Sequence, residues 1–247
     1  MNKLTLILAL LMPVLALPVT AQANTDMQLD KAPINPANQA SLQRGAKIFV
    51  NYCLNCHSAA SMRYNRLRDI GLTDEQIKAN LMFAAEKVGE PMTVAMNKKE
   101  AKLWFGAPPP DLSVIARSRT PDWLYTYLRG FYRDDTRPTG WNNVAFPNVG
   151  MPHVLNELQG EQRLLVSETQ DAHGNKVESH KLVLDKPGKL SVVEYDATVA
   201  DLVNYLVFMG EPARTTRMSL GLLVLLFLGL MFIPAYYLKK EYWKDVH

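Results

Sequence analysis

The feature that most constrains this chain is the segment Cys53-Leu54-Asn55-Cys56-His57, because the chain has no other cysteines. In a c-type haem motif, two cysteines separated by two residues bind the vinyl groups of one haem, and the adjacent histidine ligates its iron. A zinc site would need further cysteines or suitably spaced histidines nearby, and a disulfide or redox dithiol would use the same pair. We therefore predict one covalently attached haem c, with His57 as an iron ligand.

The N-terminus has the pattern of a secretory signal peptide. Lys3 precedes an apolar run over residues 4–17, and Ala21 and Ala23 are small residues at the cleavage positions. The run is too short to span a membrane. We predict a signal peptide over residues 1–23, which places haem attachment outside the bacterial inner membrane. An uncleaved anchor is the alternative.

A second membrane signal lies near the C-terminus. Residues 218–238 contain no charged side chain and would form a helix of about 31 Å, the thickness of a bilayer core. Aromatic residues and lysines typical of a membrane interface follow at its end: Tyr236, Tyr237, Lys239, Lys240, Tyr242, Trp243 and Lys244. We predict a transmembrane anchor within residues 214–247, with a short cytoplasmic tail. A buried helix of a soluble domain is the alternative.

Between these segments, residues 24–213 are expected to form one exported haem domain of mainly α-helical fold. One predicted helix begins near Asn38 or Ser41 and continues to Tyr52. A second covers residues 72–88, with Thr73 and Gln76 as its capping box, and two more cover residues 122–128 and 198–209. Two apolar segments, residues 164–166 and 182–184, flank a polar turn at residues 171–175. This pattern predicts an exposed β-hairpin inserted in the domain over about residues 161–185. The formal net charge of +3 is too small to indicate a nucleic-acid partner.

The sixth iron ligand decides function, because an open iron position binds gases or peroxide whereas a closed one passes electrons. The exported methionines are the candidates: Met62, Met82, Met92, Met96, Met151 and Met209. Met151 differs from the others because its loop is stiffened by Pro147 and Pro152 and has one free hinge at Gly150, as a loop presenting a thioether would require. His153 is the competing ligand, and His173 and His180 lie on the expected hairpin. Residue chemistry alone leaves this choice open.

The residues resemble cytochrome c1 of the ubiquinol:cytochrome c oxidoreductase, the cytochrome bc1 complex. The resemblance covers the mature chain and rests on the haem motif, Pro109-Pro110-Asp111-Leu112-Ser113, Arg117-Ser118-Arg119, Gly150-Met151-Pro152 and the C-terminal anchor. It implies a class I type cytochrome c haem domain and assigns Met151 as the axial ligand. It also implies that Pro110 packs near the haem edge, that Arg119 pairs with a propionate, and that Trp123 or Tyr125 lies close to a propionate.

The same resemblance implies the partners. The donor would be the Rieske iron-sulfur protein, the membrane partner cytochrome b, and the acceptor a cytochrome c, within a dimeric complex. Quinol oxidation would belong to cytochrome b and the Rieske protein, and we assign no catalytic residue to this chain. Two other classes remain: an independent membrane-tethered cytochrome c carrier, and a haem enzyme or gas sensor with an open sixth position.

Overall fold

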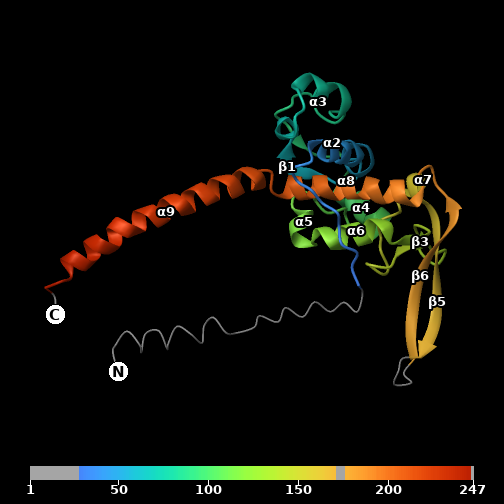
Figure 1. Ribbon diagram of the computed structural model, residues 1–247. Helices are drawn as coiled ribbons and strands as arrows, with labels where there is room; N and C mark the ends of the chain where they lie inside the picture. The colour runs from blue at the N-terminus through green and yellow to red at the C-terminus, as the bar shows by residue number, and fades with distance from the viewer. Residues whose placement is uncertain (1–27, 171–175, 246–247) are drawn as a thin grey trace.

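The computed structural model describes residues 28–170 and 176–245. About half of these residues are helical, and a long helix, α9, projects from the body that the others form (Figure 1). The helices and helical turns are α2 (Gln39–Ile48), η2 (Phe49–Cys53), η3 (Tyr64–Ile70), α3 (Asp74–Asn80), α4 (Lys98–Phe105), α5 (Ile115–Ser118), α6 (Pro121–Arg129), α7 (Asn156–Gln159), α8 (Val192–Gly210) and α9 (Arg214–Tyr242). The strands are β1 (Ala59–Arg63), β2 (Pro91–Met92), β3 (Phe131–Arg133), β4 (Trp141–Asn143), β5 (Gly160–Gln170) and β6 (Lys176–Pro187). The predicted signal peptide, residues 1–23, lies outside the described residues.

The centre of the body is the crossing of α2 over α8. A Cβ atom added to Gly45 would lie 2.1 Å from the carbonyl oxygen of Asp201, so only glycine lets the two backbones approach this closely. Beside the crossing, the rings of Phe49 and Tyr205 pack at 5.6 Å between centroids, and both side chains are fully buried. Arg44 forms an ion pair with Asp201 at 2.5 Å at the edge of the contact. The crossing therefore fixes the segment that leads into the haem motif against the longest helix of the body.

Capping residues explain where several helices begin. The Asn38 side chain accepts a hydrogen bond from the Ser41 amide, which confirms Asn38 as the first cap. The predicted capping box of Thr73 and Gln76 is present, but α3 ends at Asn80 and the prediction of a helix to residue 88 was wrong.

The start predicted for α8 was also wrong. The helix begins at Val192, because Ser191 and Glu194 form a capping box upstream of the predicted start at Thr198. Thr198 lies inside the helix, where its hydroxyl donates to the carbonyl oxygen of Glu194.

Three small antiparallel sheets of two strands each complete the described structure. The longest is the expected hairpin, in which β5 pairs with β6 from Gly160 opposite Pro187 to Gln170 opposite Lys176. It extends away from the body (Figure 1), and its turn, residues 171–175, lies outside the described residues. The Gln162 side chain ties the base of the hairpin to the body by donating to the carbonyl oxygens of Arg129 and Phe131, both at 2.9 Å.

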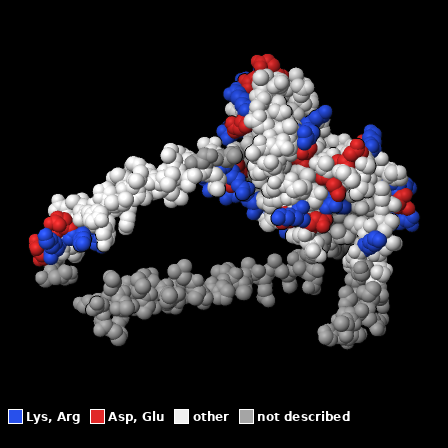
Figure 2. Space-filling view, in the orientation of Figure 1, with Lys and Arg blue, Asp and Glu red and all other residues white. Residues whose placement is uncertain are grey.

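Helix α9 has the length and composition of a membrane span. Within its segment Thr216–Tyr242, an 18-residue stretch has a mean hydropathy of 2.4 and is not buried against the body. Charged side chains gather on the body and at the far end of α9, whereas the middle of the helix shows none (Figure 2). The predicted span, residues 218–238, lies within this helix. Only residues 211–213 separate α9 from α8.

Candidate haem site

A cavity of about 340 Å³ opens beside the haem motif, where η2, α6, α8 and the loops after α4 and β4 meet. Its lining is mostly apolar, and Leu128, Val149 and Leu206 are examples. The structure brings most of the predicted site residues together there: Cys53, Cys56, His57, Pro110, Arg119, Trp123 and Met151. Tyr125 is the predicted site residue that does not line this cavity.

The haem motif folds as a tight turn after a π-helical turn. Helix η2 ends at Cys53, and the backbone amides of Cys56 and His57 both donate to the Cys53 carbonyl oxygen, at 3.1 and 2.8 Å. This turn places both thiols and the imidazole on the same cavity. Burial raises the pKa of the Cys53 thiol to about 12 and also raises the pKa of Cys56. Both thiols therefore lack the lowered pKa that a redox-active dithiol uses to form its thiolate.

The orientation of the His57 ring is set by a backbone carbonyl. Its Nδ1 atom lies 2.8 Å from the carbonyl oxygen of Pro110. Because a carbonyl oxygen only accepts hydrogen bonds, Nδ1 carries the proton in this contact and Nε2 keeps its lone pair. Burial lowers the pKa of His57, although the contact with Pro110 and the charge of Asp111 act in the opposite direction. The side chain is thus a neutral imidazole whose free nitrogen is the one suited to a metal.

The Pro110 carbonyl is itself held by a network on the following residues. The Asp111 carboxylate accepts from the amides of Ala60 and Ser113, each at 2.8 Å. Ser113 in turn accepts from the Ser61 amide at 3.0 Å through its hydroxyl oxygen. The segment after the haem motif and the Pro-Pro-Asp-Leu-Ser segment are therefore joined side by side. Asp111 and Ser113, which follow Pro110, therefore hold the loop that orients His57.

Met151 lines the cavity in a loop that packs closely against the end of α4. A Cβ atom added to Gly150 would lie 2.4 Å from the carbonyl oxygen of Phe105. The sequence suggested that Gly150 gives this loop a free hinge, whereas in the structure the absence of a side chain permits a close backbone contact. The Met151 sulfur accepts a hydrogen bond from the Tyr127 hydroxyl at 3.3 Å.

The other candidate methionines do not line the cavity. Met62, Met92 and Met209 are buried in the hydrophobic core, with exposed fractions of 2%, 0% and 5%. Met82 packs against the same core and is half-buried. Met96 is half-buried as well.

His153 lies in the core beside the Met151 loop rather than on the cavity. Its ring stacks on Phe131 at 4.8 Å between centroids and meets the edge of Trp141 at 5.0 Å. The side chain is 3% exposed, and burial lowers its pKa to about 4. His153 is therefore a neutral histidine packed between aromatic rings.

The guanidinium of Arg119 lies over two aromatic rings at the cavity wall. Its central carbon is 5.1 Å from the centroid of Trp123 and 6.0 Å from that of Phe146. Both rings line the cavity. Tyr125, in contrast, lies against Arg129, whose guanidinium carbon is 4.5 Å from the Tyr125 ring centroid. Trp123 and Tyr125 thus contact different arginines.

Sequence reasoning missed four aromatic lining residues: Tyr52, Phe105, Tyr127 and Phe146. A signal for Tyr127 was available, because residues four apart share one face of a helix whereas residues two apart do not. Trp123 and Tyr127 are four apart on α6, and their rings stack at 4.8 Å. Phe105 and Phe146 lie in segments whose approach to the cavity depends on the tertiary fold, and no local pattern indicates it.

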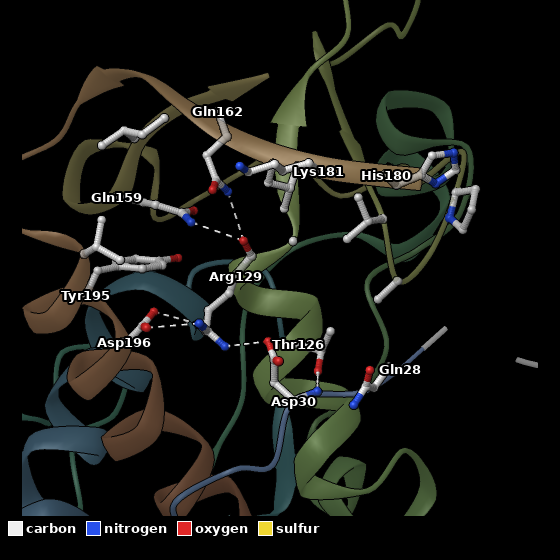
Figure 3. A pocket seen from close by; sticks show the side chains of 17 residues that line it. Gln28, Asp30, Thr126, Arg129, Gln159, Gln162, His180, Lys181, Tyr195 and Asp196 are labelled. Atoms are coloured by element: carbon white, nitrogen blue, oxygen red, sulfur yellow. Dashed lines mark hydrogen bonds and ion pairs between the residues drawn. The ribbon is translucent and has the colours of Figure 1, made fainter. Parts of the chain in front are cut away.

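A second hollow, of about 890 Å³, lies between the hairpin and the body (Figure 3). Arg129 lies in its wall and forms ion pairs with Asp30 at 2.7 Å and Asp196 at 2.6 Å. His180, a histidine weighed as a candidate ligand, lines it, but the eight predicted haem-site residues do not. The chemistry expected from the sequence therefore belongs to the smaller cavity.

The residues of the smaller cavity fit a covalently attached haem. Two thiols, an imidazole nitrogen and a thioether sulfur face one apolar space, and Arg119 adds a cation that suits a carboxylate group. A domain with this site and a long apolar helix at its end is a membrane-anchored c-type cytochrome.

Comparison with known proteins identifies the family. The model of the cytochrome C1 family matches residues 30–246, so this chain belongs to the cytochrome c1 family, as its motifs predicted. It is 52% identical over 221 residues to cytochrome c1 of Allochromatium vinosum, covering 89% of this chain and 90% of the relative. It is also 52% identical over 239 residues to a Nitrosomonas europaea protein named ammonia monooxygenase gamma subunit, covering 96% and 97%. Cytochrome c1 of Rhodospirillum rubrum is 29% identical over 240 residues, covering 85% and 83%.

Proposed function

We propose that the smaller cavity holds the haem c of this chain, attached through Cys53 and Cys56. His57 and Met151 would then ligate its iron. As a member of the cytochrome c1 family, the chain is the electron-transfer subunit of a cytochrome bc1 complex and carries one covalently attached haem c. The observation that carries the site assignment is the convergence of both thiols, the free imidazole nitrogen and one thioether on a single cavity.

When bound, haem c supplies a one-electron ferric/ferrous couple. The protein's part is to hold the ligands and exclude water. His57 is oriented by the Pro110 carbonyl, which keeps Nε2 available for the iron. Arg119 is the side chain we assign to a propionate, because guanidinium groups pair well with carboxylates. Trp123 packs against Arg119 and supports its position.

We further propose a class I type haem domain outside the bacterial inner membrane and a cytoplasmic C-terminal tail. The signal peptide expected over residues 1–23 and the long apolar helix Thr216–Tyr242 support this topology. The Rieske protein is the proposed electron donor and a cytochrome c the acceptor, with cytochrome b beside α9 in a dimeric complex. The relative of Bradyrhizobium diazoefficiens named cytochrome b/c1, 27% identical over 251 residues, supports the pairing with cytochrome b.

An independently tethered carrier would differ in how the haem domain is joined to its anchor. Such carriers use long flexible linkers, whereas three residues, Glu211–Ala213, join α8 to α9 here. A haem enzyme or gas sensor would need an open sixth position, whereas Met151 and its hydrogen-bond donor Tyr127 occupy the cavity wall. Both observations favour an electron-transfer subunit that is docked within a larger complex.

Extraction in mild detergent tests this proposal. The chain should co-purify with a cytochrome b and a Rieske iron-sulfur protein in stoichiometric amounts, and quinol should reduce its haem within the isolated complex. An independent carrier would separate from both partners under the same conditions. Recovery of the haem protein alone, with no quinol-dependent reduction in the remaining fraction, would contradict the proposal.

A further inference from the structure

Tyr127 makes a contact with Met151 that no sequence motif indicated. Its hydroxyl lies 3.3 Å from the Met151 sulfur and donates a hydrogen bond to it. The side chain lines the cavity and is 9% exposed. A thioether sulfur has two lone pairs, so it can ligate a metal through one and accept a hydrogen bond through the other.

The aromatic neighbours hold the Tyr127 ring in place. Trp123 stacks on one side at 4.8 Å between centroids with an interplanar angle of 11°. Phe131 meets the ring at 5.1 Å and 67°. With its ring packed on two sides, Tyr127 has little freedom to turn its hydroxyl away from Met151.

Asn143 ties the loop that carries Met151 to the helix that carries Tyr127. Its side-chain nitrogen donates to the Tyr127 carbonyl oxygen at 2.7 Å. Its side-chain oxygen accepts from the amides of Ala145 and Phe146, at 2.8 and 3.2 Å, on the way to Met151. Asn143 is fully buried. Asn143 therefore holds both the helix of the hydrogen-bond donor, Tyr127, and the loop of the acceptor, Met151.

We propose that Tyr127 is a positioning residue for Met151 that orients its sulfur and raises the reduction potential of the haem. This inference rests on the proposed ligation by Met151. A hydrogen bond to the sulfur draws electron density from it, and a weaker donor favours the ferrous over the ferric state. Hydrogen bonding to a ligand is one of the means by which a protein sets the potential of a haem.

The chain contains a matched control for this effect. The Tyr205 hydroxyl lies 3.7 Å from the sulfur of Met92, and neither residue lines the cavity. Both tyrosines are buried and both contact a methionine sulfur, but only Tyr127 does so at the proposed ligand. Tyr205→Phe therefore measures how the loss of a buried tyrosine hydroxyl changes the protein when the proposed ligand is not involved.

The test compares Tyr127→Phe with Tyr205→Phe in the full-length holoprotein, because phenylalanine keeps the ring and removes only the hydroxyl. Redox titration should give a lower potential for Tyr127→Phe than for the wild type, together with a shift of the absorption band that ferric iron shows when thioether sulfur is bound. Tyr205→Phe should leave both unchanged. Denaturant unfolding of each variant measures the loss of stability separately from these two properties.

The proposal is overturned if the potential of Tyr127→Phe equals that of Tyr205→Phe, or rises. Met151→Leu separates this failure from a wrong ligand assignment. If Met151→Leu opens the iron to carbon monoxide while Tyr127→Phe changes nothing, the ligand is correct and Tyr127 has no effect on it. If Met151→Leu leaves the potential and the closed site intact, the ligand assignment and the role of Tyr127 both fail.

Discussion

The Nδ1 atom of His57 lies 2.8 Å from the carbonyl oxygen of Pro110, so the proposed iron ligand is oriented by the backbone of a loop more than 50 residues away in the chain. Because this acceptor belongs to the backbone, no substitution can remove it. The quality of this contact depends instead on how rigidly the loop is held, and Asp111 is the residue that holds it.

Replacing Asp111 by alanine should loosen this loop. The variant loses hydrogen bonds from the Ala60 and Ser113 amides to a charged carboxylate, which should cost about 1 to 3 kcal/mol of stability. The measurement is denaturant unfolding of the holoprotein in detergent, followed by haem absorption. Asp135→Ala is the control, because the Asp135 side chain is 90% exposed and pairs only with Arg133 in the described structure. Equal losses for the two variants would contradict the role given to Asp111.

The sequence predicted the structural features that depend on residues close together in the chain. The cap at Asn38 and the capping box of Thr73 and Gln76 follow from side chains that bond to neighbouring backbone groups. The hairpin follows from two apolar segments that flank a polar turn. The sequence instead predicts that α8 starts at Thr198, because Thr198 and Asp201 have the spacing of a capping box, whereas Ser191 and Glu194 form the capping box that begins this helix.

The cavity itself was less predictable. The motif identified Cys53, Cys56 and His57 as neighbours, but only the fold brings Met151 and Phe105 to the same space. Family resemblance could not separate Trp123 from Tyr125, whereas the helical period places Trp123 on the same face as Tyr127. The contact of Gly150 with the Phe105 carbonyl depends on two loops that meet in space, and no sequence pattern indicates such an approach.

Gly150→Ala should displace the Met151 loop. The new methyl group would lie 2.4 Å from the Phe105 carbonyl oxygen, so the loop or the end of α4 must move, at a cost of about 1 to 3 kcal/mol. We expect a lower unfolding midpoint and a changed ferric absorption spectrum. Gly89→Ala is the control, because a Cβ atom there meets nothing within 4 Å. If Gly150→Ala matches Gly89→Ala in both measurements, the close approach is not required.

A chain ending at Glu211 should be exported, carry haem and remain soluble without detergent. This truncation removes α9, the only segment among the described residues long and apolar enough to span a membrane. Fractionation of the periplasm and membranes, with haem staining of denatured protein, checks both properties. Partition of the truncated chain entirely into membranes would show that another anchor exists and that the proposed topology is wrong.

The most direct test of the account is carbon monoxide binding to the reduced Met151→Leu variant. Leucine has no group that can ligate iron, so the variant should keep its covalent haem, bind carbon monoxide and have a much lower reduction potential than the wild type, whose closed site should exclude the gas. Met209→Leu, a change in the core outside the cavity, should behave like the wild type. If Met151→Leu excludes carbon monoxide and keeps the wild-type potential, the sixth ligand lies elsewhere and the proposed site is wrong.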